Sequence, residues 1–294
     1  MPNRHSAIAL LVLLGLWGTA QPAFSQALVP HSVQLDPTVL ERQGLSLAQE
    51  AVQLAQFQQF ELALPRARLA SELAPKNAEI WSLLGGLYLQ TNSLDNGIQA
   101  LKKAQSLSPK NSAVLFALGS AYFQQGKYAT AVENLQAGLR IKPNVPGALF
   151  DLGNAYLMLK RYSEAIAQYE KAVSVDKDFW PAINNIGLIR YEQGNVDDAL
   201  KRWRAAVAID KKAAEPLLAI AVALYVRGDR EQGLMMGENA IKIDSRYGDL
   251  KFLKENLWGD KLLADAKRFL ETPRMKASLA QAQEQNAKRP TPPQ

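Results

Sequence analysis

The side chains that most often carry out catalysis are nearly missing from this sequence. It contains no cysteine, and its two histidines, His5 and His31, lie near the N-terminus. A chain without cysteine has no thiol nucleophile, no disulfide and no thiolate metal ligand. Zinc or haem ligation and histidine-dependent catalysis would also lack residues in the main body of the chain. Because the acidic residues form no acid–base constellation either, we predict no catalytic site, no metal site and no cofactor.

A regular spacing of other residues indicates a binding surface. Glycines recur 34 residues apart, and a tyrosine and a proline keep the same step: Gly85, Gly119, Gly153 and Gly187; Tyr88, Tyr122 and Tyr156; Pro75, Pro109 and Pro143. A fixed period of this length marks a protein built from stacked repeats. Such a protein usually offers an extended surface for a partner and no reaction centre.

Each 34-residue unit contains two stretches with apolar residues at three- and four-residue spacing, which indicates two amphipathic helices. In the unit 112–145, the polar break 124–127 separates the two stretches and contains Gly126. A glycine inside a helix costs about 1 kcal/mol relative to alanine. The recurring glycines therefore predict that a facing helix leaves no room for a side chain. The recurring proline ends the second helix, because proline lacks an N–H group.

These residues resemble the signature of the tetratricopeptide repeat (TPR) family over about 44–247. The pattern is carried by Trp81, Leu84, Gly85, Tyr88, Ala104 and Pro109, and again by Leu118, Gly119, Tyr122, Ala131 and Pro143. The resemblance implies an all-α fold, a right-handed α-solenoid of about six helix-turn-helix units with a C-terminal capping helix pair. The expected units are 44–77, 78–111, 112–145, 146–179, 180–213 and 214–247.

The N-terminal segment predicts export. Arg4 precedes an apolar run from Ala7 to Trp17, and small residues follow it. This order predicts that 1–25 is a secretory signal peptide, cut before Gln26 or after Ala27. A retained membrane anchor and a buried core helix are the alternatives, although the apolar run is short for a membrane span. Residues 26–43 are expected to form a linker and the start of the first helix.

The C-terminal segment continues the apolar pattern over 248–271, which predicts a pair of capping helices with Asp260 as a helix cap. A repeat array needs such a cap to cover its exposed end. Residues 272–294 are polar and end in a proline-rich run. We expect them to form a disordered tail.

The resemblance also implies where a partner would bind, because TPR proteins line a groove with the first helix of each unit. The residues it assigns to this groove are Phe116, Phe123, Phe150, Asn154, Leu157, Asn184, Asn185, Leu188, Tyr191 and Tyr225. Aromatic side chains there would supply contact area, and the amides could pair with a peptide backbone. Packing of the same residues against neighbouring helices is the alternative. Phe150, Glu215 and Ala219 occupy positions that are cationic in chaperone-binding TPR domains, so such a carboxylate clamp is not expected.

The leading hypothesis is a non-enzymatic scaffold or assembly factor that holds another protein. The net charge of +6 is spread over the repeats, which predicts no nucleic-acid partner. The whole chain, including 257–266, is similar to thylakoid TPR proteins of cyanobacteria and chloroplasts. That similarity implies membrane association, a thylakoid membrane or lumenal location, and a role in chlorophyll synthesis. It also implies protochlorophyllide oxidoreductase or a photosystem subunit as the partner. The alternatives are a periplasmic envelope-assembly module and, as a minor one, a helical-repeat transferase subunit.

Overall fold

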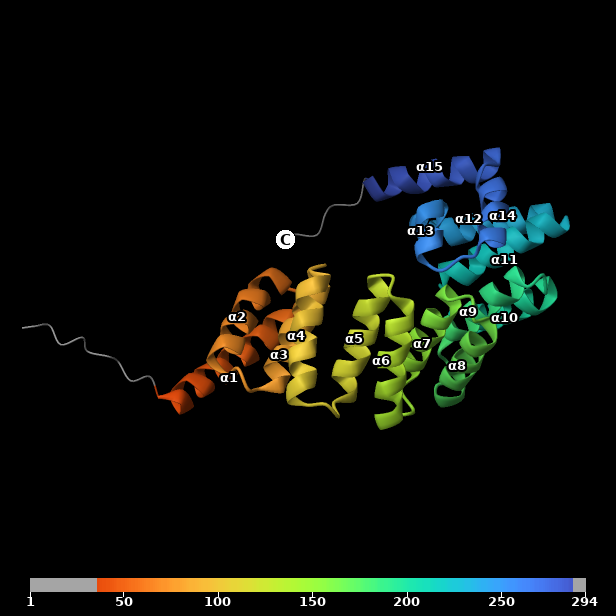
Figure 1. The fold of residues 1–294 in the computed structure, drawn as a ribbon. Coiled ribbons are helices and arrows are strands. Elements are labelled where there is room, and N and C mark those ends of the chain that lie inside the picture. The colour runs from red at the N-terminus through yellow and green to blue at the C-terminus, as the bar shows by residue number, and fades with distance from the viewer. Residues whose placement is uncertain (1–35, 288–294) are drawn as a thin grey trace, which may run out of the picture. The chain divides into compact units, whose positions relative to one another are not determined.

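The computed structural model describes residues 36–287, and every regular element in that range is a helix (Figure 1). Twelve helices form six consecutive pairs. The first helices of the pairs are α1 (Pro37–Gln56), α3 (Ala78–Gln90), α5 (Ser112–Gln124), α7 (Pro146–Met158), α9 (Trp180–Glu192) and α11 (Ala214–Arg227). The second helices are α2 (Phe60–Leu73), α4 (Leu94–Leu107), α6 (Tyr128–Ile141), α8 (Tyr162–Val175), α10 (Val196–Ile209) and α12 (Arg230–Ile243). The fold is a TPR solenoid, as the sequence predicts.

The chain divides into two compact units, residues 1–39 and 40–294. Of the first unit only residues 36–39 are described, and there Oδ1 of Asp36 accepts the N–H of Thr38 at 2.8 Å. The segment for which we predict a signal peptide or anchor lies outside the described residues. Within 36–287, none of the helices is both long and apolar enough to cross a membrane. The description below concerns the second unit.

From α2 to α12, consecutive helices pack against each other. The closest contacts within a pair occur at the recurring glycines. A Cβ atom on Gly187 would lie 2.4 Å from Nε1 of Trp203, and one on Gly119 would lie 2.5 Å from Cγ of Leu135. Real Cβ contacts are longer than this, so the prediction that the facing helix leaves no room for a side chain is confirmed.

The turn inside each pair also follows the 34-residue step. One residue per turn has a left-handed backbone, with φ between +57° and +104°: Gln58, Asn92, Gly126, Lys160, Gly194 and Gly228. Glycine adopts this conformation without strain, whereas other residues adopt it at a cost. The chain thus repeats the turn geometry even where the residue type changes.

The helix pairs begin with different local signals. Oδ1 of Asn77 accepts the N–H groups of Glu79 and Ile80 at 2.9 and 3.1 Å, which satisfies two free donors at the start of α3. Pro146 opens α7 at a position where no N–H group is needed. These signals fix where α3 and α7 begin.

After α12 the chain forms a short 3-10 helix, η1 (Ser245–Gly248), followed by α13 (Leu250–Glu255), α14 (Asp260–Leu270) and α15 (Pro273–Ala287). Helix α15 packs against α12, and its Met275 is completely buried. The expectation of a disordered tail is therefore wrong for residues 273–287, and 288–294 lie outside the described residues. A single apolar stripe, formed by Met275, Leu279 and Ala282, is enough to dock this otherwise polar helix.

Candidate partner-binding groove

We use the term groove face for the side of α1, α3, α5, α7, α9 and α11 that carries the positions assigned to a partner by the TPR resemblance. Each position is reached by a step of three or four residues along a helix, so the positions share one side. The structure shows that this face differs between its two halves. The half on α9 and α11 is covered by the chain's own C-terminal segment, whereas the half on α1 to α7 is not.

Four predicted groove residues on α9 are buried. Asn184, Asn185, Leu188 and Tyr191 are each at most 5% exposed. The prediction that they line an open groove is wrong. Helix α14 packs against both α9 and α11, and its side chains share one apolar core with Leu188 and Tyr191. Figure 1 shows α13 and α14 folded back beside α11.

The asparagines form an internal polar ladder. Nδ2 of Asn184 donates to Oδ1 of Asn185 at 3.1 Å, and Nδ2 of Asn185 donates to Oδ1 of Asn154 at 2.9 Å. The hydroxyl of Tyr169 on α8 also donates to Asn154, at 2.7 Å. Buried amides need such partners, because an unpaired polar group is costly inside a protein. The amide of Asn185 therefore joins α9 to α7, whereas that of Asn184 bonds its neighbour on α9 and leaves its own Oδ1 without a partner among the described residues. Of the three amides, only that of Asn154 stays partly exposed.

Two carboxylates of the groove face hold the returning C-terminal segment. Glu192 at the end of α9 accepts the N–H groups of Lys261 and Leu262 at 3.1 and 2.9 Å. It caps α14, a role that we expected for Asp260; Asp260 is instead the first residue of the helix, and Gly259 precedes it. A Cβ atom on Gly259 would lie 2.3 Å from Cδ of Glu192, so a larger residue there would displace the Glu192 side chain that caps α14.

The second carboxylate, Glu215 on α11, is buried and accepts the indole N–H of Trp258 at 3.0 Å. Burial raises the pKa of Glu215 to about 7, although the hydrogen bond from Trp258 opposes this shift. Within residues 36–287, none of the ion pairs involves Glu215. It is a buried carboxyl group at the junction of the groove face and the C-terminal segment.

The four predicted groove aromatics are half-buried and pack within the fold. The ring of Phe150 lies 5.5 Å from that of Phe179 in an edge contact, and that of Phe123 lies 5.3 Å from Tyr128. Tyr225 meets Phe269 of α14 at 5.4 Å. Phe116 lies against Gly138, where a Cβ atom would be 2.4 Å from its ring. These contacts correspond to the alternative that aromatics at helical spacing pack against neighbouring helices.

Leu157 and Leu188 are the predicted groove residues that line a cleft. This cleft, of about 180 Å³, lies where the open half of the groove face meets the turn 257–260 of the C-terminal segment. Met158 beside it is 37% exposed. The cleft marks the border between the covered half and the open half.

The open half begins with a larger apolar cavity, which we did not predict. It measures about 430 Å³ and lies between α1 and α3, lined among others by Leu45, Val52, Ile80 and Leu83. Leu45 and Val52 are 40% and 41% exposed, although both are large and apolar. The sequence contained the information needed to find it. The repeat positions that assign groove residues in units three to six fall on Leu45 and Val52 in unit one and on Leu83 in unit two.

The centre of the open half carries one carboxylate. The hydroxyl of Ser120 on α5 donates to Oδ2 of Asp151 on α7 at 2.9 Å. Burial raises the pKa of Asp151, and the hydrogen bond from Ser120 opposes this only in part. None of the ion pairs within 36–287 involves Asp151.

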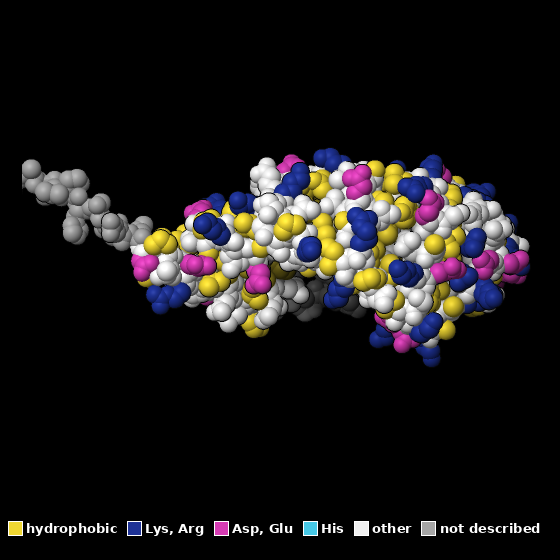
Figure 2. Space-filling view, turned by 60° about the horizontal axis from the view of Figure 1, so that its bottom comes forward, with side chains coloured by type: hydrophobic (Ala, Val, Ile, Leu, Met, Phe, Trp, Pro, Cys, Tyr) yellow, Lys and Arg dark blue, Asp and Glu magenta, His cyan; other side chains and the backbone are white. Residues whose placement is uncertain are grey.

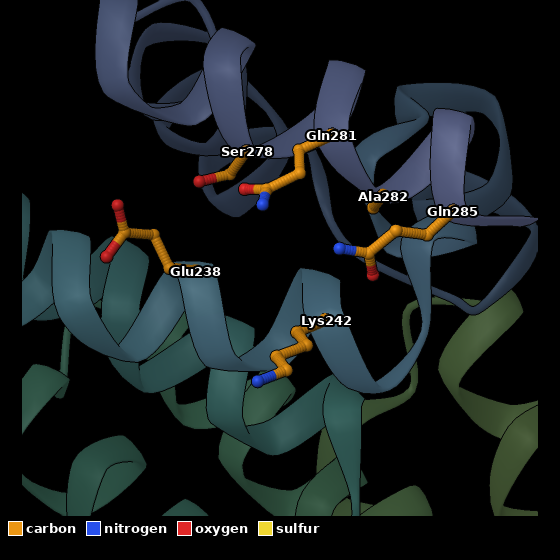
Figure 3. Close-up of a pocket in the computed structure, with 6 residues that line it drawn as sticks. All are labelled: Glu238, Lys242, Ser278, Gln281, Ala282 and Gln285. Atoms are coloured by element: carbon orange, nitrogen blue, oxygen red, sulfur yellow. The ribbon is translucent and has the colours of Figure 1, made fainter.

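A polar cleft of about 330 Å³ lies away from the groove face, between α12 and α15 (Figure 3). Glu238 and Lys242 on α12 face Ser278, Gln281 and Gln285 on α15. Arg274 ties the two helices together by pairing with Glu238 and Glu231 at 2.7 and 2.6 Å. The cleft is the space left beside this ionic contact. No group of three His, Asp or Glu residues within 36–287 is arranged to hold a metal ion.

The charges on the surface are mixed. In Figure 2, basic and acidic side chains alternate over the visible face and do not gather into one patch of a single sign. Apolar side chains are exposed between them. This face offers no extended basic surface of the kind that binds a nucleic-acid backbone.

Comparison with known protein families shows which family the chain belongs to. The family model for the TPR domain of cytochrome c-type biogenesis protein H matches residues 30–178, about half of the chain. The chain belongs to this family. A second model, a TPR repeat, matches residues 187–228. No curated protein matches the sequence.

This chain, a member of the cytochrome c-type biogenesis protein H TPR domain family, shares its fold with many solved structures. PilF of Pseudomonas aeruginosa is 18% identical, with a TM-score of 0.61 over 74% of this chain and 98% of its own. YrrB, a TPR protein with an unusual peptide-binding site, is 20% identical, with a TM-score of 0.50 over 69% and 97%. MamA of Desulfovibrio magneticus RS-1 is 16% identical, with a TM-score of 0.54 over 61% and 98%. At these identities the likeness shows the fold alone.

The extent of the family match follows the division of the groove face. Residues 30–178 contain α1 to α8, and therefore all four first helices whose groove face is open. The covered helices α9 and α11 lie after it. A chain of this architecture is a protein–protein interaction module.

Proposed function

We propose that this protein is an assembly factor of cytochrome c biogenesis that holds a partner polypeptide on the open half of its groove face. The observation that carries the proposal is the family match over 30–178, which ends where the open half ends. A TPR surface of this type suits a helix or an extended peptide, because its apolar residues form a stripe along stacked helices.

The apolar surface of the open half supports a polypeptide partner. Leu45 and Val52, which are 40% and 41% exposed, line the cavity between α1 and α3, and Met158, which is 37% exposed, lines the cleft at the other end of the open half. Exposed apolar side chains at such hollows are typical of an interaction site. YrrB, which shares the fold, is described as having a peptide-binding site.

We place the protein in the cell envelope, on the outer side of a membrane, as a signal peptide or anchor at 1–25 would require. This is the periplasmic alternative from the sequence, and it replaces the thylakoid hypothesis: the family points to cytochrome c biogenesis and gives no support for chlorophyll synthesis or for protochlorophyllide oxidoreductase. We also propose that the protein acts without catalysis of its own, because scaffolding is the usual role of this repeat.

The test is a direct binding measurement with purified protein and a c-type cytochrome polypeptide before haem attachment. We expect the haem-free chain to bind and the folded holocytochrome to bind at least tenfold more weakly, because folding hides its apolar helices. Leu45→Glu combined with Val52→Glu should abolish binding. The matched control is Leu62→Glu combined with Leu69→Glu, which places the same charges on exposed leucines of α2 (53% and 44% exposed).

Equal binding by both double variants would refute the groove face as the site. Failure of the wild-type protein to bind any haem-free cytochrome polypeptide would refute the cytochrome c assignment. In the native host, deletion of the protein should lower the amount of covalently haem-bound cytochrome c, measured by haem staining of denatured membranes.

A further inference from the structure

Helix α14 shows what kind of ligand the groove face accepts. Its buried residues recur at three- and four-residue spacing and form one stripe: Leu262, Asp265, Ala266, Phe269 and Leu270. This stripe lies on α9 and α11, where Leu188, Leu218 and Val222 complete a shared apolar core. The groove face therefore binds an amphipathic helix in one half of the molecule, and that helix belongs to the chain itself.

A single polar pair lies in the middle of this contact. The Tyr191 hydroxyl of the groove face donates to Oδ2 of Asp265 in the α14 stripe at 2.6 Å. A polar group inside an apolar contact must be matched, because an unmatched one costs the free energy of its desolvation. The pair therefore fixes the register of the helix on the face.

At the centre of the open half, the groove face supplies a hydrogen-bond acceptor, whereas at Tyr191 it supplies a donor. The acceptor is Asp151, and the neutral hydroxyl of Ser120 is its hydrogen-bond donor. Leu157 and Met158 both lie about two turns further along α7. A partly buried carboxylate that is in no ion pair within 36–287 is complementary to a basic group on a ligand.

We propose that the open half binds an amphipathic helix of the partner that places a Lys or Arg, located in the middle of its apolar stripe, against Asp151. This inference rests on the proposed function and adds the chemistry of the partner segment to it. The partner helix would extend the row begun by α14, because the cleft lined by Leu157 and Met158 is bounded on its other side by the turn 257–260. The two helices would thus occupy one continuous face.

The test uses a displayed library of helical peptides built on the α14 stripe. The apolar positions equivalent to Leu262, Ala266, Phe269 and Leu270 are kept, and the position equivalent to Asp265 and the exposed positions are randomised. The full chain is the target. We expect Lys and Arg to be enriched at the position equivalent to Asp265. Enrichment of neutral or acidic residues there would overturn the proposal.

A double-mutant cycle locates the contact. Asp151→Asn, which keeps the hydrogen bond from Ser120, should weaken the binding of a selected peptide by roughly tenfold to a hundredfold. Replacing the basic residue of the peptide by Met should produce the same loss, and the two changes together should produce little more. Glu133→Gln, which removes the same charge from an exposed position on α6, is the matched control and should have no effect.

The outcomes separate this inference from the proposed function. Binding that is abolished by Leu45→Glu with Val52→Glu but is unchanged by Asp151→Asn keeps the groove face and overturns the role of Asp151. Binding that no groove-face variant changes overturns both. Thermal melts of each variant establish that it is folded, so a loss of binding reports on the contact.

Discussion

The hydroxyl of Tyr191 donates a 2.6 Å hydrogen bond to Oδ2 of Asp265, which lies 74 residues later in the sequence. Both residues are buried, and Arg268 pairs with the other oxygen of the same carboxylate. This bond joins the groove face to the helix that covers it. It explains why a residue expected to contact a partner is instead part of the interior of the molecule.

Tyr191→Phe should therefore destabilise the C-terminal half. The variant keeps the ring but removes a hydrogen bond to a buried carboxylate, which is worth about 1.5–3 kcal/mol. We expect the urea midpoint to fall and amide hydrogen exchange to accelerate first in α14. Tyr225→Phe is the control, because the ring of Tyr225 also packs against α14 but no hydrogen bond of its hydroxyl is seen. Equal effects of the two variants would contradict the importance of the bond.

The stability of the protein should depend on pH through Glu215. Burial raises its pKa in the folded protein to about 7, above the value of 4.5 for an ordinary glutamate. The folded state therefore favours the protonated carboxyl group. This contribution to stability is fully present below pH 4.5, falls as the pH rises, and is lost above about pH 7. The conversion of 1.36 kcal/mol per pKa unit gives a total change of about 3 kcal/mol.

The comparison of wild type with Glu215→Gln isolates this effect from other titrating groups. The amide keeps an acceptor for the indole N–H of Trp258 but does not ionise. In urea unfolding at pH 4.5 and pH 8, we expect the variant to match wild type at the lower pH and to exceed it at the higher pH. A constant difference between the two proteins at both pH values would show that Glu215 does not titrate in this range.

The fold followed from the sequence because its cause is local and repeated. The glycine at each of four 34-residue steps faces a large side chain 16 residues later, as with Gly187 and Trp203, so one rule gives the four central pairs of helices. The covered half of the groove face could not be predicted in this way. The stripe on α14 shows that the helix must pack on something, but it does not say whether the target is the end of the array or the face of α9 and α11. That choice depends on tertiary contacts such as those of Tyr191 and Glu192.

Two adjacent glycines should respond in opposite directions to the same substitution. A Cβ atom on Gly85 would lie 2.6 Å from Cγ of Leu101, whereas one on Gly86 would meet nothing within 4 Å. Gly85→Ala should destabilise the protein by roughly 1–3 kcal/mol, because it overpacks the contact of α3 with α4. Gly86→Ala should stabilise it by up to about 1 kcal/mol, because alanine favours a helix. Thermal melts of the two variants provide the measurement, and shifts of the same sign would contradict the packing argument.

Removal of α15 should damage the protein, although the composition of this segment predicts disorder. A chain that ends at Thr272 loses Met275, which is completely buried, and the ion pairs of Arg274 with α12. Loss of a buried methionine side chain alone costs about 2 kcal/mol or more. A chain that ends at Ala287 keeps these contacts and is the control. We expect only the shorter chain to unfold at lower urea concentration and to bind a dye specific for apolar surface. If both truncated chains behaved like the full-length protein, α15 would contribute nothing to the fold.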